Sequence, residues 1–422
     1  MTTEQKRNML VLDTAYTYDF LTKRKLTRIV TCKDVDGYFD HVWTVHAVAS
    51  LFYSASSGLR FGRPVVRKLS DGHTHIEGKI GRFEKLRWFP FLNFLFAQID
   101  LICLLLNIIK KNHIAILRAE DFLFNGILGL IITRFKRLHF VIGVWASAEK
   151  IRKNTNKTLS PRLKYMWLEK MIEGFILRRA DLVFCGTEFY RSFALNHGVL
   201  RENTVVSRFG ASIEASHFLA PSQRESGYSE LAKLGVTDEN VIMLISRLEK
   251  LKRVDHLIKV LSCLKGKDLK VKAMFVGDGS MREELIALSK ELGVADQVVF
   301  CGNRDQDWLL RVIPCAAVIL SPSTGRALTE AALGAVPIVA YDTDWQNEII
   351  EHGITGELIP DLNYSAMAES VEKILKNDSY AGMIGSNVRE RALTMMEPQN
   401  INARVIKAYE KFFTLIDTKS LK

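Results

Sequence analysis

The sequence predicts an α/β protein in which two domains each carry a parallel β-sheet. Its 422 residues are more than one hydrophobic core ordinarily organises. Short apolar runs alternate with helical patterns, as expected where helices connect parallel strands. A polar stretch at 221–227 interrupts this alternation, and a second series of strands begins after it. We therefore expect domains at 1–220 and 221–397, followed by a helical segment, 398–422, that packs back toward the first domain.

The first domain is expected to alternate short apolar strands with longer helices. The expected strands are 8–12, 44–49, 113–117, 140–144, 182–185 and 204–207. The expected helices are 86–110, 125–136, 161–179 and 189–196. This alternation is typical of a Rossmann-like domain.

The pattern restarts after the polar stretch with strands of the same kind. They are expected at 241–246, 271–277, 298–301, 317–320 and 337–340, with helices that include 255–264 and 281–292. Ser280 and Glu283 have the spacing of a capping box at the start of the second of these helices. The last long helix is expected at 400–413.

Positive charge is concentrated in the first half of the chain. The formal net charge is +11, and residues 1–215 carry 33 Lys and Arg against 19 Asp and Glu, whereas the remainder is slightly acidic. A basic half indicates an anionic partner. Because the chain lacks an aromatic and basic platform for nucleic acid, we expect no nucleic-acid partner, and favour an anionic lipid headgroup or a phosphorylated acceptor.

Cysteine usage indicates a reducing compartment. The six cysteines form no CxxC pair and no cluster with histidine at metal-ligand spacing. Several lie in apolar strand-like runs, where a thiol behaves as a small hydrophobic group. The polar N-terminal residues lead straight into a strand, so no signal peptide is expected. These features predict a cytoplasmic protein, peripheral on the inner face of the plasma membrane if it contacts lipid.

The segment 86–109 is the nearest approach to a membrane segment in the sequence. The carboxylate of Asp100 disfavours a spanning helix. Two alternatives remain open. The segment is either a buried crossover helix, or its half at 88–96, which is flanked by Arg82, Lys85 and Arg87, rests in a bilayer interface.

Two stretches of the second half carry the strongest chemical signal. Ser246–Lys252 follows an apolar strand, so Arg247 and Lys252 lie just past a strand end. Ser321–Pro337 runs from a strand through a glycine into a helix that carries Glu330. Strand ends and helix N-termini are where open α/β sheets bind phosphorylated ligands. Two cations and one carboxylate at such a place indicate a nucleoside diphosphate held by its phosphates and ribose.

This arrangement resembles the donor site of nucleotide-sugar glycosyltransferases of the GT-B fold, and most closely that of the retaining enzymes in glycosyltransferase family four. The likeness covers the whole second half. It includes Phe275–Gly279, Val298–Gly302 and Ile350–Gly356, and it extends to Ala180–Thr187 and Gly210 in the first half. The resemblance implies two Rossmann-like domains whose parallel sheets face an interdomain cleft.

In that family, the residues that match Arg247 and Lys252 bind the donor diphosphate. Negative charge builds on the departing diphosphate while the sugar becomes oxocarbenium-like. Fixed guanidinium and ammonium groups take up that charge without a metal and without reorganising. Backbone N–H groups at a helix start add donors. The residues expected to contribute there are Gly325, Arg326, Ala327 and Leu328.

Glu330 matches the second glutamate of the family's paired signature, which accepts hydrogen bonds from the ribose hydroxyls. Pro322 stands where the first glutamate would be, and in relatives that acid contacts the donor sugar. Thr324 and Arg326 are therefore expected to take over part of its role. The other residues expected near the donor base or sugar are Gly277, Asn303 and Arg304.

In the first domain, Arg118–Asp121 follows a strand and faces the cleft by analogy with the family. Glu120 or Asp121 is expected to orient or deprotonate the acceptor hydroxyl. The alternative for Asp121 is to cap the helix that follows. Trp145 stands where the family often has a histidine that contacts the donor sugar, so its aromatic face is expected to serve there.

The resemblance implies a glycosyltransferase that moves a sugar from a nucleotide diphosphate sugar to an acceptor hydroxyl with retention, without a metal or other cofactor. The favoured acceptor is a lipid-linked saccharide or an envelope polysaccharide intermediate, with peripheral membrane contact. Two alternatives remain. One is a nucleotide-sugar epimerase of the same fold, and the other is a non-catalytic nucleotide-sugar-binding module, which the missing first glutamate suggests.

Overall fold

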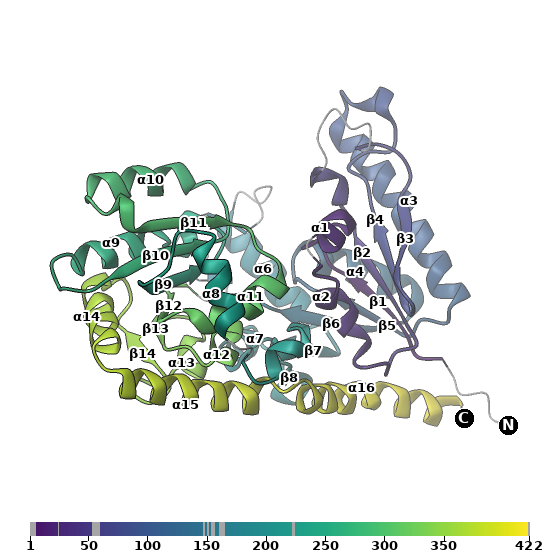
Figure 1. Cartoon of the computed structure of the whole chain (residues 1–422). Helices are drawn as coiled ribbons and strands as arrows, with labels where there is room; N and C mark the ends of the chain where they lie inside the picture. Colours follow the sequence, from purple (N-terminus) through teal and green to yellow (C-terminus); the bar gives the residue numbers. More distant parts are fainter. Residues whose placement is uncertain are drawn as a thin grey trace. The chain divides into compact units, whose positions relative to one another are not determined.

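The computed structural model describes residues 6–420 except 24, 53–59, 147, 150–151, 153–156, 160–164, 222–223 and 324. The chain divides into two compact units (Figure 1). Unit 1 comprises Met1–Arg208 and Gln399–Lys422, and unit 2 comprises Phe209–Pro398. Each unit is built around one β-sheet whose strands run mostly parallel, which confirms the predicted α/β class.

Unit 1 contains an eight-stranded sheet in the order β3-β4-β2-β1-β5-β6-β7-β8. The strands are β1 (Asn8–Leu12), β2 (His41–His46), β3 (Val65–Ser70), β4 (His73–Glu77), β5 (Ile116–Ala119), β6 (His139–Val144), β7 (Leu182–Cys185) and β8 (Thr204–Val206). All neighbouring strands are parallel except β3 and β4, which form an antiparallel hairpin at one edge. Its turn is Asp71–Gly72, where Gly72 has a φ of +77° that suits a glycine.

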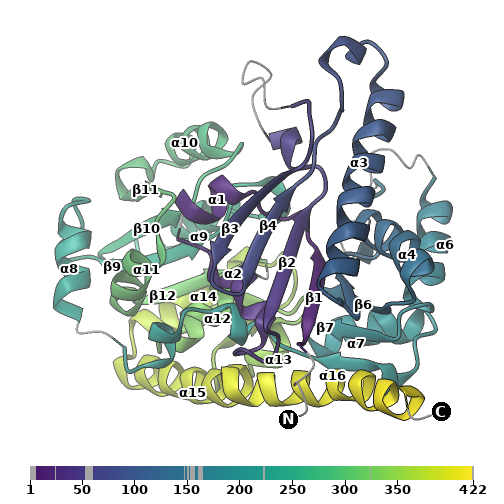
Figure 2. The same ribbon diagram turned by 90° about the vertical axis from the view of Figure 1, so that its right-hand side faces the viewer.

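The helices of unit 1 connect successive strands. They include α1 (Tyr18–Lys23), α2 (Arg28–Thr31), α3 (Pro90–Lys111), α4 (Phe124–Lys136), α6 (Met166–Leu177), α7 (Glu188–Asn196) and α16 (Pro398–Ser420), with the short 3-10 helix η1 (Cys32–Asp34) after α2. The connections β4 to β5, β5 to β6 and β6 to β7 all run in the same direction across the sheet. Because such crossovers are right-handed, α3, α4 and α6 lie on the same face, as Figure 2 shows.

The strand register shows which side chains of the sheet point toward these helices and which point toward the opposite face. Leu117 and Phe140 are paired and point toward α4, where a Cβ added to Gly129 would lie 2.9 Å and 2.8 Å from their side chains. The close approach explains a glycine at this position. Helix α4 therefore packs directly on the sheet.

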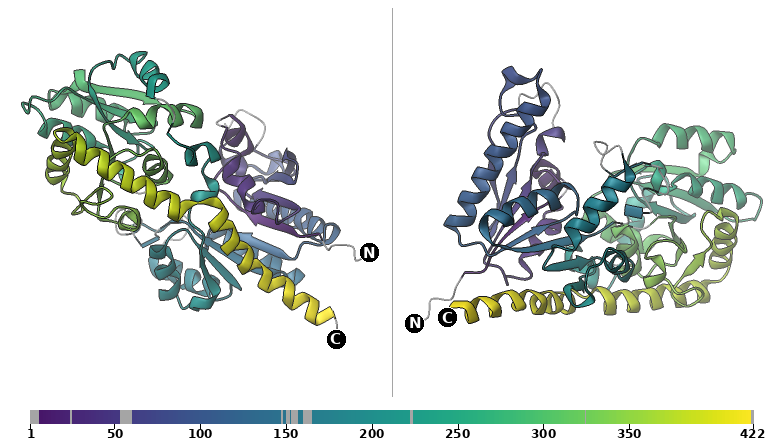
Figure 3. Two further views of the ribbon diagram at one scale, coloured as in Figure 1. Left: turned by 60° about the horizontal axis from the view of Figure 1, so that its bottom comes forward. Right: turned by 180° about the vertical axis from the view of Figure 1, so that it is seen from behind.

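Helix α16 covers the other face of the unit 1 sheet (Figure 3). Tyr409 is fully buried there, and its ring centroid lies 5.1 Å from that of Phe184. Arg118 donates a hydrogen bond to the Tyr409 hydroxyl (3.4 Å), and that hydroxyl donates one to the Met9 Sδ atom (3.6 Å). The end of the chain thus completes the core that the first strand begins.

Unit 2 contains a six-stranded, fully parallel sheet in the order β11-β10-β9-β12-β13-β14. Its strands are β9 (Asn240–Ile245), β10 (Val271–Val276), β11 (Val298–Gly302), β12 (Val318–Ser321), β13 (Ile338–Tyr341) and β14 (Glu357–Ile359). Its helices include α8 (Arg224–Ala232), α9 (Asp255–Cys263), α10 (Arg282–Glu291), α11 (Gln306–Val312), α12 (Arg326–Leu333), α13 (Gln346–Ile349), α14 (Tyr364–Leu375) and α15 (Asp378–Met396). One face of the sheet forms a continuous core with α9, α10 and α14.

The structure differs from the sequence-based expectations at several places. β14 was not among the expected strands, and β2 begins and ends three residues earlier than expected. The hairpin β3–β4 was not expected, because its charged and histidine-containing strands lack an apolar run. The segment expected as a linker instead begins helix α8, which packs against α11. Phe209 already belongs to unit 2, where its ring is tilted against that of Trp345 with the centroids 5.5 Å apart, so the two units divide earlier than residue 220.

In each sheet the strand order reverses at one point. In unit 1 the chain moves outward to one side of β1 and then to the other, so the reversal lies between β1 and β5. In unit 2 it lies between β9 and β12. Ligands of open α/β sheets bind at the carboxyl ends of the two strands that flank such a reversal.

We predict that unit 1 loses stability in mild acid. Burial lowers the pKa of His46 in β2 and of His75 in β4 from 6.5 to about 4. The unfolded chain therefore binds protons below about pH 6.5 that the folded unit accepts only near pH 4, so the free energy of unfolding falls as pH drops through this window. The loss should be at most ~3 kcal/mol per histidine.

Chemical denaturation of the full chain at several pH values checks this expectation. The double variant His46→Leu/His75→Leu should flatten the pH dependence between pH 6.5 and 4, whereas His113→Asn, at an exposed position, should keep the wild-type slope. An unchanged slope in the double variant would contradict the assignment.

Candidate functional site

The predicted residues of the second half gather at the carboxyl edge of the unit 2 sheet. Arg247 follows β9, Gly277 follows β10, Asn303 follows β11 and Gly325 lies between β12 and α12. β9 and β12 flank the strand-order reversal, so the stretches that carry Arg247 and Gly325 meet where this fold class binds ligands.

Arg247 and Lys252 begin and end the loop that leaves β9. The Arg247 side chain is exposed, and Lys252, half-buried, ends the 3-10 turn η8 (Lys250–Lys252). The loop is fixed by its backbone, because Leu248 donates from its N–H to the Asp278 carbonyl (3.1 Å) and accepts from the N–H of Met281 (2.9 Å). The two cations are therefore attached to an ordered loop.

Arg253, the next residue, has a structural role instead. Its guanidinium forms a two-pronged ion pair with Asp361, in which the Nη2–Oδ2 distance is 3.2 Å. The pair ties the start of α9 to the loop after β14. Of these neighbouring cations, Arg247 is the one whose side chain is directed to solvent.

Gly277 allows the loops after β9 and β10 to approach each other. Its φ is +139°, and an added Cβ would lie only 1.9 Å from the Ser246 carbonyl oxygen. At Gly279 an added Cβ would lie 2.5 Å from the Leu248 carbonyl oxygen. The predicted glycines therefore shape the Arg247 loop, and they need not touch a ligand to do so.

Helix α12 begins at Arg326, directly after Gly325. The first backbone N–H groups of a helix have no partner within it, so those of Arg326 and Ala327 remain available to an anion. The Leu328 N–H is not equivalent, because it donates to the Gly325 carbonyl (3.1 Å). Of the backbone N–H groups expected to bind the diphosphate at this helix start, those of Arg326 and Ala327 therefore remain.

Glu330 is buried and held by Arg326 one helical turn earlier. Arg326 donates from Nε to Glu330 Oε1 at 2.8 Å. The Arg326 Nη2 atom is also buried, and it has no hydrogen-bond partner among the residues that the structure describes. A buried guanidinium nitrogen ordinarily donates a hydrogen bond, so this atom is suited to an oxygen supplied by a ligand.

The structure describes two of the three remaining predicted residues. Thr324 lies outside the described residues. Asn303 and Arg304 are exposed at the end of β11, and the Arg304 guanidinium lies over the Trp308 ring, 5.0 Å from its centroid. Across the described part of the chain, no group of three or more His, Cys, Asp or Glu side chains is placed to hold a metal ion.

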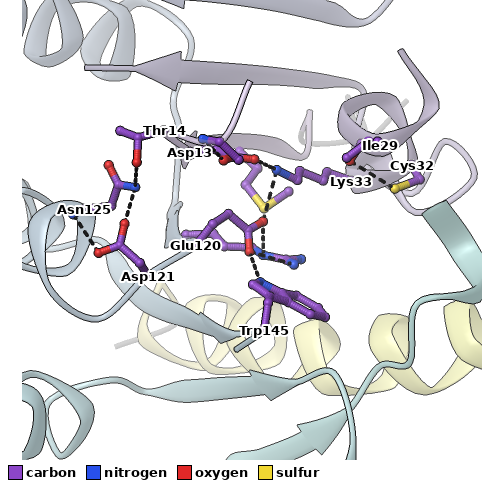
Figure 4. Close-up of polar contacts among 12 residues, drawn as sticks. Asp13, Thr14, Ile29, Cys32, Lys33, Glu120, Asp121, Asn125 and Trp145 are labelled. Atoms are coloured by element: carbon purple, nitrogen blue, oxygen red, sulfur yellow. Dashed lines mark hydrogen bonds and ion pairs between the residues drawn. The ribbon is translucent and has the colours of Figure 1, made fainter. Parts of the chain in front are cut away.

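The predicted first-domain residues lie at the carboxyl edge of the unit 1 sheet, in a buried charged cluster (Figure 4). Lys33 of η1 forms ion pairs with Asp13 (2.5 Å), which follows β1, and with Glu120 (3.2 Å), which follows β5. Arg118 adds a second cation, with its Nε atom 3.1 Å from Glu120 Oε1. Two carboxylates and two cations are thus buried together at the strand-order reversal of unit 1.

These ion pairs fix the protonation of Glu120. Burial by itself would raise the pKa of the Glu120 carboxyl, but Arg118 and Lys33 outweigh burial and lower it. The Trp145 indole N–H also donates to Glu120 Oε2. Glu120 is consequently a weak proton acceptor in this arrangement, better suited to orient a donor group than to remove a proton.

Asp121 makes the contacts of a helix cap. Its Oδ1 atom accepts from the N–H groups of Leu123 (2.9 Å) and Asn125 (3.2 Å) at the start of α4. Burial raises the pKa of Asp121 to about 6, against the effect of these hydrogen bonds. A carboxyl with that pKa would be a capable base. However, its Oδ1 atom caps α4, and its Oδ2 atom accepts from the Asn125 side-chain amide, so these contacts favour the alternative role of a helix cap.

Sequence reasoning missed Asp13 and Lys33. Asp13 directly follows the first strand, which is a usable signal for a residue at the sheet edge. Lys33 lies in a short helical stretch without a motif, and only the fold brings it to Glu120. A partner for Glu120 from outside its own strand could not be found from spacing.

Comparisons with known proteins identify related sequences and structures. Residues 230–391 match the family model described as glycosyl transferases group 1. The chain is 23% identical over 292 residues to the alpha-monoglucosyldiacylglycerol synthase of Streptococcus pneumoniae, an alignment that covers 64% of this chain and 65% of that protein. The alignments span about half the length of several other curated relatives.

Two solved structures are similar over nearly the whole chain. One is Anabaena Alr3699/HepE in complex with UDP, with a TM-score of 0.70, 17% identity, and coverage of 96% of this chain and 100% of that chain. The other is sucrose-phosphate synthase from Thermosynechococcus elongatus, with a TM-score of 0.73, 17% identity, and coverage of 97% and 100%. At these identities the likeness establishes the fold.

We predict that Gly277→Ala severely destabilises unit 2. The new methyl group would meet the Ser246 carbonyl at a backbone conformation that is itself strained for alanine, and a loss of ~3 kcal/mol or more is expected. Gly235→Ala is the matched control, since Gly235 also has a positive φ (+74°) but has no atom within 4 Å of the added Cβ. It should cost about 1 kcal/mol. Equal losses measured by chemical denaturation would contradict the proposed close approach.

Proposed function

We propose that the protein is a nucleotide-sugar glycosyltransferase, because residues 230–391 match the model of glycosyl transferases group 1 and the chain has the GT-B fold. It transfers a glycosyl group from a nucleoside diphosphate sugar to the hydroxyl of an acceptor. The observation that carries the proposal is the placement of Arg247 and Lys252 on one ordered loop at the strand-order reversal of unit 2.

The proposed reaction depends on neutralising a departing diphosphate. As the bond between the sugar and the diphosphate breaks, negative charge accumulates on the phosphate oxygens. Arg247 and Lys252 supply two positive charges from a loop whose backbone is already hydrogen-bonded, so little reorganisation accompanies their action. The N–H groups of Arg326 and Ala327 add donors at the start of α12. In this proposal no metal ion is needed.

The proposed nucleoside site uses Glu330 for the ribose. One of its oxygens is held by Arg326, which orients the carboxylate and leaves the other oxygen to accept from a ribose hydroxyl. The free Arg326 Nη2 atom then donates to an oxygen of the donor. Arg326 thereby replaces part of what the missing first glutamate does in relatives, by positioning Glu330 as well as by contacting the ligand.

The acceptor is proposed to bind at the carboxyl edge of the unit 1 sheet. Glu120, which accepts from the Trp145 indole N–H, would orient it, with Asp121 retained as the cap of α4. Retention of configuration is part of the proposal and rests on the family likeness. The relative from Streptococcus pneumoniae is named for a diacylglycerol product, which supports a lipid-linked or envelope saccharide as acceptor and a cytoplasmic location beside the membrane.

The first test of the proposal removes the paired cations. Arg247→Ala and Lys252→Ala should each lower kcat by roughly 10²-fold, because each takes away a charge that stabilises the leaving group. Turnover would be measured with the nucleotide sugar whose nucleoside diphosphate (UDP, GDP or ADP) gives the largest thermal shift with the wild type.

The matched control for that test is Lys250→Ala, an exposed lysine in the same 3-10 turn. It should retain nearly full activity. If Lys250→Ala lost as much activity as Lys252→Ala, the loss would reflect the total positive charge of the loop, and the assignment of Arg247 and Lys252 as the diphosphate-binding pair would be wrong.

Two other results would identify the alternative functions. Release of epimerised sugar without an acceptor would identify an epimerase, and nucleotide-sugar binding without any turnover would identify a binding module.

A second test addresses the pair Arg326 and Glu330. Glu330→Gln should weaken nucleoside diphosphate binding by about 10-fold, because the amide remains but the charge that accepts from the ribose is lost. Arg326→Gln should weaken binding by a similar factor. Since the two side chains act together, the double variant should bind little worse than either single variant, as measured by isothermal titration. Additive losses would contradict the coupling.

A further inference from the structure

Three helices of unit 1 leave apolar stripes exposed on their outer sides. The stripes repeat every four residues, so their members share one side of each helix. They are represented by Leu95 and Ile99 on α3, Ile127 and Ile131 on α4, and Trp167 and Met171 on α6. α3 contacts α4 and α4 contacts α6, and Figure 2 shows the three helices side by side. We call this surface the three-helix face.

The surface is most apolar where α3 begins. Trp88 and Phe91 are 76% and 77% exposed there. Their backbone is nevertheless held in place, because the buried Asn93 side chain accepts from the N–H groups of Arg82 (2.6 Å) and Phe83 (2.8 Å). Large aromatic side chains are thus presented to solvent from an anchored turn. Single exposed hydrophobic residues are ordinary, but a contiguous patch marks an interaction surface.

Charge around the three-helix face is positive. Exposed basic side chains lie beside it on each helix or just before it, including Lys85, Arg87, Lys136 and Lys170. The acidic side chains of α3 and α6 are ion-paired within the unit, Asp100 with Arg82, and Glu169 and Glu173 with the buried Arg152. The exposed Glu84 lies beside Lys85 and Arg87 but is outnumbered by the basic residues, so the face offers apolar side chains together with a net positive charge.

We propose that the three-helix face docks into the interface of a bilayer that contains anionic lipid. The apolar stripes enter the boundary between headgroups and acyl chains, Trp88 and Trp167 lie at the level of the headgroups, and the lysine and arginine side chains contact the lipid phosphates. A protein partner would not require both a flat apolar surface and a basic border. The combination matches the chemistry of an anionic membrane surface.

Helix α3 lies in the plane of the membrane in this proposal and does not cross it. By length and composition it passes as a membrane span, with a mean hydropathy of 2.0 and 28% of its most apolar stretch buried. However, its two ends join β4 and β5 of the same sheet, so crossing a bilayer would pull that sheet apart. Its inner side, which includes Leu101 and Leu105, is buried in unit 1.

The proposal is tested by flotation of the full chain with lipid vesicles, a measurement that needs no turnover and is therefore independent of the proposed function. Vesicles of phosphatidylcholine with phosphatidylglycerol should bind the protein, and vesicles of phosphatidylcholine alone should bind at least 10-fold less. Trp88→Ser/Phe91→Ser and Trp167→Ser/Met171→Ser should each reduce binding to the anionic vesicles at least 10-fold. Lys85→Gln/Arg87→Gln should reduce it several-fold and weaken its dependence on salt.

The matched controls are in unit 2. Tyr228→Ser/Met383→Ser removes two exposed apolar groups, and Lys265→Gln/Lys290→Gln removes exposed charges. Both should bind as the wild type does, and circular dichroism should show every variant folded. Loss of vesicle binding in the α3 variant but not in the α6 variant would contradict the proposal that the whole three-helix face contacts the membrane.

Three further results would overturn the proposal. The first is absence of vesicle binding. The second is concentration-dependent self-association that the α3 and α6 variants abolish, which would mean that a second copy covers the face. The third is binding that resists alkaline extraction, which would mean that α3 inserts.

Discussion

The arrangement of this protein depends on one geometric constraint: parallel strands all deliver their carboxyl ends to the same edge of a sheet. Where the strand order reverses, the helices diverge and leave part of that edge uncovered. Asp13 and Glu120 flank the reversal of one sheet, and Arg247 and Gly325 flank that of the other. Polar and charged residues collect at these two places because the backbone there is not covered by a helix.

Charged side chains are arranged differently at the carboxyl edges of the two sheets. In unit 1 the carboxylates and cations are buried together, and each holds the other in its charged form. Burial alone would lower the pKa of Lys33, but Asp13 and Glu120 outweigh it and raise the pKa. The charges of this network are balanced within unit 1. In unit 2 the Arg247 side chain faces solvent, and the Arg326 Nη2 atom has no hydrogen-bond partner among the described residues, so that edge is suited to charge that a ligand supplies.

Much of the fold could be predicted from sequence because apolar periodicity reports burial. The strand at Asn8–Leu12 and the one at Leu182–Cys185 lie where their apolar runs predict them. The hairpin β3–β4 was missed although Asp71–Gly72 is a strong turn signal, because strand Val65–Ser70 is charged on its outer side. Ser280 also illustrates a limit, since its hydroxyl donates to Glu249 instead of capping α10.

The residues of the candidate site also fall into those that the sequence could locate and those that it could not. Residues placed by strand ends and glycine turns, such as Arg247 and Gly277, could be located because their positions follow from local structure. Partners that depend on packing could not. Nothing in the spacing of the sequence shows that Lys33 meets Glu120, or that the Leu328 N–H is already used within its own turn. The first contact exists only once distant segments have been brought together, and the second depends on the backbone conformation of the first turn of α12.

The position of Tyr409 has a consequence for the order in which the chain acquires its structure. Unit 2 is continuous in sequence, so its core can close as soon as residue 398 has left the ribosome. Unit 1 needs Tyr409 and its helical neighbours Ile401 and Val405, all buried, which are synthesised after the whole of unit 2. One face of the unit 1 sheet therefore stays uncovered until residue 409 has been synthesised, which is after the whole of unit 2. Completion of the unit 1 core follows synthesis of unit 2, although unit 1 contains the N-terminal strands.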